Sequence, residues 1–167
     1  MKLGVELNWE TSVHASWRLS DDSCADAGSA NWGILPELTS WRLATLQETD
    51  GPNLYVNGSG DWWQVFGSYS VPVIAKNLKD EDDLFAHSSR IRDMGQAYLD
   101  GVVFQPVVLV SFALEGPYVA IDGNHRLVAL YQQGLLAGTK VIVGTDDRIG
   151  TSHALFREAV WSVDDYQ

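Results

Sequence analysis

Five consecutive residues of the sequence carry groups that can bind an anion or move a proton: Asp122, Gly123, Asn124, His125 and Arg126. An arginine guanidinium can hold phosphate oxygens through two parallel hydrogen bonds. A histidine can donate a hydrogen bond to phosphate or transfer a proton near neutral pH. A glycine lets the backbone approach a ligand closely, because no Cβ stands in the way. These residue types favour a small anion pocket, with phosphate as the anion that suits them.

The elements around these residues would place them at the amino end of a helix. Residues 118–121 are apolar and rich in β-forming side chains, which predicts a strand. Leu127, Leu130 and Tyr131 then recur with helical spacing until Gly134 ends the pattern. The first turn of a helix has unpaired backbone N–H groups and lies at the positive end of the helix dipole. A strand-to-helix turn of this kind would supply backbone donors to the same anion.

The same residues also have a purely structural interpretation. Asp-Gly is a common turn, and either Asp122 or Asn124 can cap the helix. His125 can hydrogen-bond to a backbone carbonyl, and Arg126 can pair with an acid on the surface. The local chemistry leaves both interpretations open.

The sequence changes character near Gly67, after which its patterns become clearer. They predict a strand over residues 68–75, which Pro72 pushes towards a sheet edge or end. A helix with an acidic first turn is predicted over residues 78–100. The elements predicted after it are a buried strand, a second strand and a last helix: residues 106–114, 141–144 and 152–161. Together they indicate a mixed α/β (α+β) class in a single domain.

The first part of the chain, residues 1–67, is predicted to be a tryptophan-rich extension packed on a core formed by residues 68–167. Six of the seven tryptophans lie in this extension, and its periodicity is too poor to assign elements. Trp62 and Trp63 are candidate walls of a substrate pocket. The simpler interpretation is that they fill the core or cover a loop, since tryptophans are mostly structural.

The composition is that of an acidic globular chain. Hydrophobic residues make up 46% of it, which argues against disorder, and the formal net charge is -11. Nucleic-acid backbones need a basic face, so nucleic acid is not an expected partner. The single cysteine, Cys24, cannot form an intramolecular disulfide, which favours a reducing, cytoplasmic setting. The amino terminus lacks a signal-peptide pattern, and the longest apolar stretch, residues 102–114, is too short to span a membrane.

The histidines and acids do not predict a built-in metal site. No two of the four histidines share a metal-ligand spacing: His14, His87, His125 and His153. The acidic run at residues 80–83 is interpreted as a solvated helix start.

The order of these elements, with Gly-x-His-Arg at the start of a helix, resembles the ParB/sulfiredoxin-like superfamily. The resemblance covers roughly residues 68–143: Val-Pro, a helix, Pro-Val-Val-Leu-Val, a turn and Tyr-Val-Ala-Ile-Asp-Gly-Asn-His-Arg. It implies that fold and a nucleotide site. The residues that would hold ATP phosphates, by position, are Gly123, Asn124, His125 and Arg126.

The residues at two positions indicate which branches of that superfamily this chain resembles. Sulfiredoxins carry a catalytic cysteine just before the histidine, and Asn124 stands there, which excludes sulfinic-acid repair by that route. Kinases of free serine have an acidic residue before the glycine, and Asp122 matches it. The resemblance therefore implies Asp122 as a metal contact or general base, with His125 as the second catalytic candidate. Four residues lie on the predicted helix that faces the phosphates in sulfiredoxins, and one or two of them are further ligand candidates: Ser88, Ser89, Arg90 and Arg92.

The expected function is that of an ATP-dependent phosphotransferase, or a related phosphate-handling enzyme, acting on a small molecule. Mg²⁺ would arrive with the nucleotide. The alternative is a non-catalytic nucleotide-binding module that changes shape for a protein partner. A ParB-like nuclease or DNA-bound switch is least favoured, because the chain is acidic and few residues follow the strand at 141–144.

Overall fold

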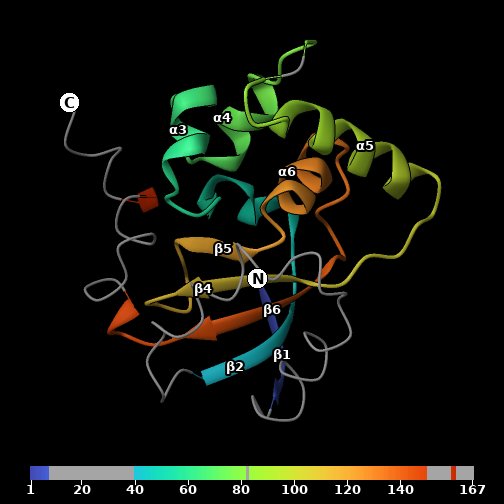
Figure 1. Ribbon diagram of the computed structural model, residues 1–167. Coiled ribbons are helices and arrows are strands. Elements are labelled where there is room, and N and C mark those ends of the chain that lie inside the picture. Colours follow the sequence, from blue (N-terminus) through green and yellow to red (C-terminus); the bar gives the residue numbers. More distant parts are fainter. Residues whose placement is uncertain (8–39, 82, 150–158, 161–167) are drawn as a thin grey trace, which may run out of the picture.

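In the described part of the chain, six strands form one mixed sheet in the order β1-β2-β6-β4-β5-β3 (Figure 1). The computed structural model describes residues 1–7, 40–81, 83–149 and 159–160. The strands are β1 (Lys2–Leu7), β2 (Ser40–Thr45), β3 (Leu54–Tyr55), β4 (Val107–Ser111), β5 (Tyr118–Asp122) and β6 (Lys140–Thr145). The helices are the 3-10 helix η2 (Glu48–Asn53) and the α-helices α3 (Gly60–Phe66), α4 (Val71–Lys76), α5 (His87–Leu99) and α6 (Asn124–Gln132). The class is therefore α/β in a single domain, as predicted.

The centre of the sheet is a strand that is apolar along most of its length. β4, with the sequence VVLVS, runs parallel to β6 and antiparallel to β5, and all five of its residues are buried. β-branched side chains favour extended backbone and fit a pleated surface, which explains why this stretch forms a strand. The three strands predicted over residues 106–114, 118–121 and 141–144 are confirmed as β4, β5 and β6.

The first 67 residues contribute strands to both ends of this sheet. β2 pairs with β6, and β3 pairs with β5, so the two chain segments share one set of hydrogen-bonded strands. At the β2–β6 pair, Trp41 lies opposite Gly144. A Cβ on Gly144 would lie 2.8 Å from the Trp41 ring, so the missing side chain makes room for the indole.

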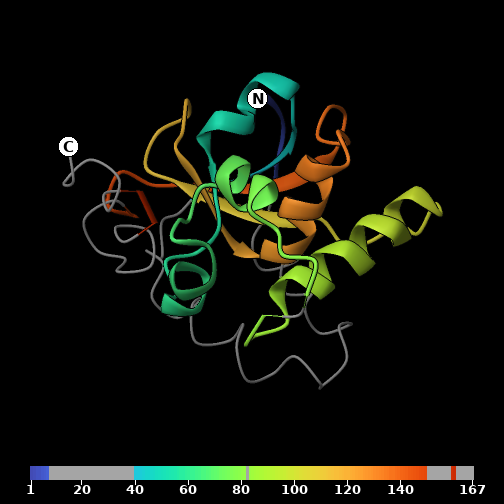
Figure 2. The same cartoon turned by 90° about the horizontal axis from the view of Figure 1, so that it is seen from above.

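The helices α3, α4, α5 and α6 gather over one face of the sheet (Figures 1 and 2). α6 is central among them, because it contacts α5, α4, β4 and β5. Leu127, Val128, Ala129 and Leu130 of α6 are buried, as the predicted apolar stripe requires. The start of α6, where the candidate residues lie, is thus held by packing on several sides.

The strand predicted over residues 68–75 is wrong, because the structure forms helix α4 there. Pro72 lies at the start of this helix, where its missing N–H needs no partner. Val71 and Ile74 are the fully buried residues, and their spacing of three suits a helix rather than an alternating strand.

The helix predicted over residues 78–100 begins nine residues late, at His87. The Asp83 carboxylate accepts the backbone N–H groups of Phe85, His87 and Ser88, and so it satisfies the donors of the first turn. The acidic run is therefore no part of the helix, although its last member fixes where the helix begins. Burial would raise the pKa of Asp83, but these hydrogen bonds outweigh it and lower the pKa to about 2.

Some predictions fall on parts of the chain that the structure does not describe. Ala159 and Val160 are helical, whereas the rest of the helix predicted over residues 152–161 lies outside the described residues. Cys24, His14 and His153 also lie outside them. Among the described residues, the helices are too short or too polar for any of them to cross a membrane.

Candidate functional site

The turn between β5 and α6 leaves a helix start with three open backbone donors. Gly123 has a φ of 80°, a left-handed conformation that favours glycine, and the helix begins at the next residue. The Leu127 N–H donates to the Gly123 carbonyl over 2.9 Å, which closes the first helical turn. Within the described residues, the N–H groups of Asn124, His125 and Arg126 have no hydrogen-bond partner. These donors and the helix dipole point to an anion.

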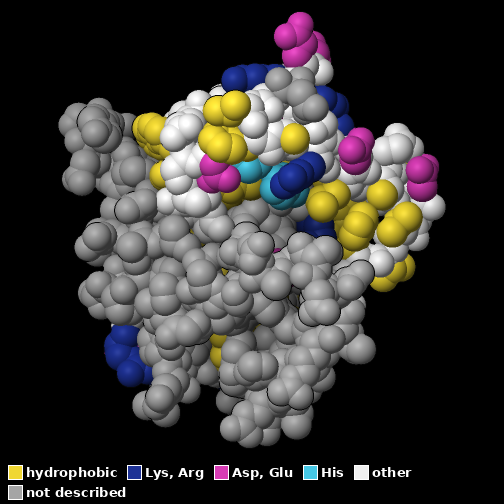
Figure 3. All heavy atoms as spheres, viewed as in Figure 1, with side chains coloured by type: hydrophobic (Ala, Val, Ile, Leu, Met, Phe, Trp, Pro, Cys, Tyr) yellow, Lys and Arg dark blue, Asp and Glu magenta, His cyan; other side chains and the backbone are white. Residues whose placement is uncertain are grey.

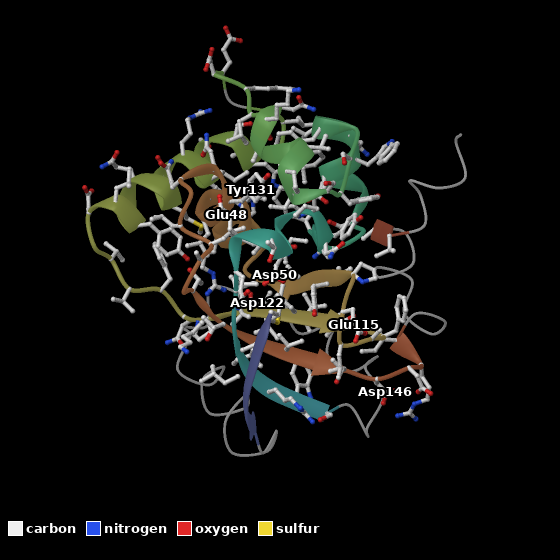
Figure 4. The ribbon with its side chains drawn as sticks, turned by 180° about the vertical axis from the view of Figure 1, so that it is seen from behind. Glu48, Asp50, Glu115, Asp122, Tyr131 and Asp146 are labelled. Atoms are coloured by element: carbon white, nitrogen blue, oxygen red, sulfur yellow. The ribbon has the colours of Figure 1, made fainter. Side chains whose placement is uncertain are left out.

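Asp122 and Arg126, both predicted site residues, form an ion pair with each other. Nη2 of Arg126 lies 2.7 Å from Oδ2 of Asp122. Asp122 is the last residue of β5 (Figure 4). Nη1 of Arg126 donates to the carbonyl of Gln105 and lies 3.5 Å from that of Pro106. Only 12% of the Arg126 side chain is exposed. The expectation of a guanidinium free to reach phosphate therefore does not match the structure, where Arg126 ties α6 to two neighbouring segments.

Gly123 provides the space that this arrangement of Arg126 needs. A Cβ at Gly123 would lie 2.9 Å from Nη2 of Arg126 and 3.0 Å from its central carbon. The guanidinium thus lies across the glycine, and both the positive φ and the close contact disfavour any larger residue.

Asn124 holds a loop in place. Its Oδ1 accepts the backbone N–H of Asn57 over 2.9 Å, and Asn57 lies between β3 and α3. The side chain therefore connects the start of α6 to the segment that leads into α3.

His125 turns towards a second histidine that comes from another helix. Nε2 of His125 lies 2.8 Å from Nδ1 of His87 at the start of α5. On the other side of its ring, His87 has its Nε2 atom 3.2 Å from Oδ2 of Asp61 on α3. The carboxylate lies off the N–H direction, so this buried nitrogen has charge contact with Asp61 but no well-aimed hydrogen bond. Three helices thus bring Asp61, His87 and His125 into one chain of contacts.

Aromatic rings enclose this pair of histidines. Trp62 stacks on His87 with ring centroids 4.1 Å apart and an interplanar angle of 12°, and it lies 5.0 Å from His125. Phe66 and Phe85 flank His87 at 6.2 Å and 5.8 Å. Trp62 is buried, so it both fills the core and forms a wall of the site, whereas Trp63 is 42% exposed and contacts Tyr69.

Burial keeps both histidines neutral near pH 7. Desolvation is the main cause that lowers the pKa of His125 to about 4, and the nearby His87 and Arg90 lower it further against the pull of Asp61 and Asp83. The pKa of His87 is also lowered, again mainly by burial. A neutral imidazole can accept a proton, so His125 has the protonation state of a general base rather than of a fixed cation.

Arg90 is a cation near His125 that pairs with no other described residue. It is exposed on the first turn of α5, and its guanidinium has no partner in the part of the chain that the structure describes. The other three candidates of this helix contact backbone: Ser88 accepts from the Lys79 N–H, and Ser89 and Arg92 donate to carbonyls. Figure 3 shows histidine surface in the region between α3 and α6, beside a basic side chain.

A groove of about 630 Å³ lies elsewhere, between the ends of α5 and α6 and the segment before β4. Its lining is mostly apolar and includes Tyr98, Val103, Phe104, Leu130 and Lys140. His125 and Arg90 do not line it, so it is separate from the histidine site.

The sequence indicates residues 122–126, Arg90 and Trp62 as candidates, but it does not single out Asp61 or His87. Asp61 and His87 share no informative spacing with His125, because they come from helices far apart in the chain.

Within the described ranges, no three histidines, cysteines or acids are placed to hold a metal ion together. Comparison with known proteins gives no match to a family model, a curated protein or a solved structure.

Proposed function

We propose that this protein is a phosphate-handling enzyme, an ATP-dependent phosphotransferase that acts on a small molecule. The observation that carries the proposal is the combination at the start of α6: three open N–H groups, a neutral accessible histidine and an exposed arginine. The first two come from the Gly-x-His-Arg stretch. The order of β4, turn, β5 and α6 around it supports the resemblance to the ParB/sulfiredoxin-like superfamily.

The backbone and Arg90 would hold the phosphates. The N–H groups of Asn124, His125 and Arg126 donate to phosphate oxygens, as helix starts do in other nucleotide sites. Arg90, whose charge acts on the nearby His125, would add a charge-assisted hydrogen bond from α5. Asp122 and Arg126 brace the turn that aims these donors, so their contribution is to geometry. Mg²⁺ would bind through the phosphates, since the described acids form no metal cluster.

His125 would act as the general base. It accepts the proton of the acceptor hydroxyl while that oxygen forms a bond to the γ-phosphorus. The bond from this phosphorus to the bridging oxygen breaks, and its electron pair leaves with ADP. ATP supplies the phosphoryl group, and the protein supplies position, charge and the proton acceptor.

Nucleotide binding and turnover test this proposal separately. MgATP at a hundred times its dissociation constant stabilises a protein by about 2.7 kcal/mol, so the melting temperature should rise. Phosphorus NMR of ATP mixed with a pool of hydroxyl-bearing metabolites should show a new phosphoester. His125→Gln should keep the thermal shift and lower the rate about 10²–10⁴-fold.

Each failure has a distinct meaning. No thermal shift with any common nucleotide at millimolar concentration contradicts the pocket. A thermal shift without any product contradicts the enzyme and supports the nucleotide-binding module, which would use the same donors without transferring phosphate.

A further inference from the structure

We propose that Asp61, His87 and His125 form a proton relay that fixes His125 as its Nε2–H tautomer and leaves the Nδ1 lone pair open to the site. In this relay His87 is a positioning residue, because it acts on the reaction only through His125. The assignment of the tautomers follows from the contacts alone, whereas their use in phosphoryl transfer rests on the proposed function.

The contacts decide which nitrogens carry the protons. The 2.8 Å separation of His87 Nδ1 and His125 Nε2 requires one hydrogen between them. If His87 supplied it, its unprotonated Nε2 would lie buried 3.2 Å from the negative Asp61 carboxylate, and no hydrogen would offset the repulsion between these two acceptors. A proton on His87 Nε2 instead places a donor opposite the negative charge. His87 Nδ1 then accepts, and His125 Nε2 donates.

This assignment leaves His125 Nδ1 as the unprotonated nitrogen. Among the described residues it has no hydrogen-bond partner, and it does not belong to the buried nitrogens without a partner. The nitrogen is therefore accessible. A base needs such an accessible lone pair, and the relay supplies it without any change of rotamer.

The surroundings favour proton movement along the relay. Trp62, Phe66 and Phe85 shield the His87 ring from water, which strengthens each charge interaction inside. When His125 Nδ1 takes a proton, the Nε2 proton of His125 can shift to His87 Nδ1. His87 then carries a proton on both ring nitrogens, and its positive charge lies beside the Asp61 carboxylate.

The other charges that face the pair come from the same helices. Asp83, just before α5, favours the protonated form of both histidines, and Arg90 on α5 disfavours it. On α6, the guanidinium of Arg126 is paired with the carboxylate of Asp122. Among the described residues, Asp61 is thus the acid in direct contact with the His87 ring, and its removal is the sharpest perturbation of the relay.

NMR of the ligand-free protein tests the tautomers directly. With ¹⁵N-labelled histidine, long-range proton–nitrogen correlations at pH 7 show which ring nitrogens are protonated. We expect both His87 and His125 to be protonated at Nε2 and unprotonated at Nδ1. A proton on Nδ1 of His125 would overturn the relay.

Two substitutions of His87 separate positioning from packing. His87→Gln keeps a carbonyl oxygen that can accept from His125, so the Nε2–H tautomer should persist. His87→Leu removes the acceptor but fits the aromatic surroundings, so the Nδ1–H tautomer should appear and the pH profile of turnover should shift. Equal tautomers in the two variants, with both folded by circular dichroism, would contradict the positioning role.

Asp61→Asn tests the charge, with Asp93→Asn as the matched control. Asp93 is an exposed acid on α5 without a contact in the described part of the chain, and its substitution removes the same charge from the surface. We expect Asp61→Asn to lower the pKa of both histidines further and Asp93→Asn to leave both unchanged. Similar shifts in the two variants would mean that net charge, and not the relay, sets the titrations.

The relay and the proposed function can fail separately. The predicted tautomers without any phosphoryl transfer would support the relay and refute the proposed function. Phosphoryl transfer with the opposite tautomer would refute the relay and support the proposed function.

Discussion

The five adjacent residues that suggested a site take up different roles in the structure. Asp122 and Arg126 pair with each other, Asn124 holds a loop, and the partly buried His125 contacts the buried His87. The sequence shows which side chains can do chemistry at a helix start. It does not show their partners, because contacts such as His87–His125 join residues 38 positions apart. The structural interpretation thus applies to the side chains of Asp122, Asn124 and Arg126, whereas the anion site is our proposal for the backbone donors of the same stretch.

Substitutions of two arginines should separate a role in nucleotide binding from a role in holding the fold. Arg126→Ala should destabilise the fold by roughly 1–3 kcal/mol, because it removes charge-assisted hydrogen bonds from a largely buried side chain. Arg90→Ala should change stability by less than about 0.5 kcal/mol, since the side chain is exposed and unpaired within the described residues. It should weaken MgATP binding about 10–100-fold.

Urea denaturation without ligand and calorimetric titration with MgATP measure the two effects. A stable Arg126→Ala variant that loses binding would show that Arg126 leaves Asp122 to hold phosphate. An Arg90→Ala variant with unchanged affinity would remove Arg90 from the site.

At the scale of elements, the sequence predicted the site's own strand and helix well and the elements before them poorly. β5 and α6 have strong local signals: a β-rich run, an Asp-Gly turn, an apolar stripe and Gly134. The stretch that forms α4 contains valines and a proline, which suit a strand edge equally well, and tertiary packing of Val71 and Ile74 decides for the helix. The start of α5 depends on a side-chain cap from Asp83, which a run of four acids does not reveal.

The turn into α6 should be sensitive to its glycine. Gly123→Ala should destabilise the protein by about 1–2 kcal/mol, because alanine at a φ of 80° is strained and its Cβ would contact the Arg126 guanidinium. Gly60→Ala is the matched control, since Gly60 begins α3 with nothing within 4 Å of an added Cβ. It should be neutral or stabilise by up to about 1 kcal/mol. Equal losses in chemical denaturation would mean that the Gly123 turn has no special geometry.

At the scale of the molecule, the α/β class followed from the alternation of elements, but the sheet order did not. β1, β2 and β3 come from the part of the chain with the weakest periodicity. β2 and β3 pair with β6 and β5 far along the sequence, and β1 joins the sheet through β2. Pairing over such separations depends on packing of complete faces, such as Trp41 over Gly144, and no local pattern encodes it.

The buried histidines should make the fold sensitive to mild acid. His125 has a pKa of about 4 when folded and about 6.5 as a free side chain, so only the unfolded chain binds this proton between those values. Stability should therefore fall as the pH drops, by roughly 2 kcal/mol between pH 7 and pH 5 from this group alone.

Urea unfolding at several pH values checks this, with His125→Gln as the reference. The difference in unfolding free energy between the two proteins should shrink as pH falls to 5. A difference that is constant with pH would mean that His125 titrates normally and is not buried as a neutral base.

If the first turn of α6 binds phosphate, its backbone amides should respond to MgATP in an NMR spectrum. A proton–nitrogen correlation spectrum of the ¹⁵N-labelled protein is recorded while MgATP is added to saturation. We expect the backbone amide signals of Asn124, His125 and Arg126 to move most, together with the side-chain signal of Arg90. Unchanged amides at millimolar MgATP, or shifts confined to the apolar groove around Tyr98 and Phe104, would contradict the phosphate site.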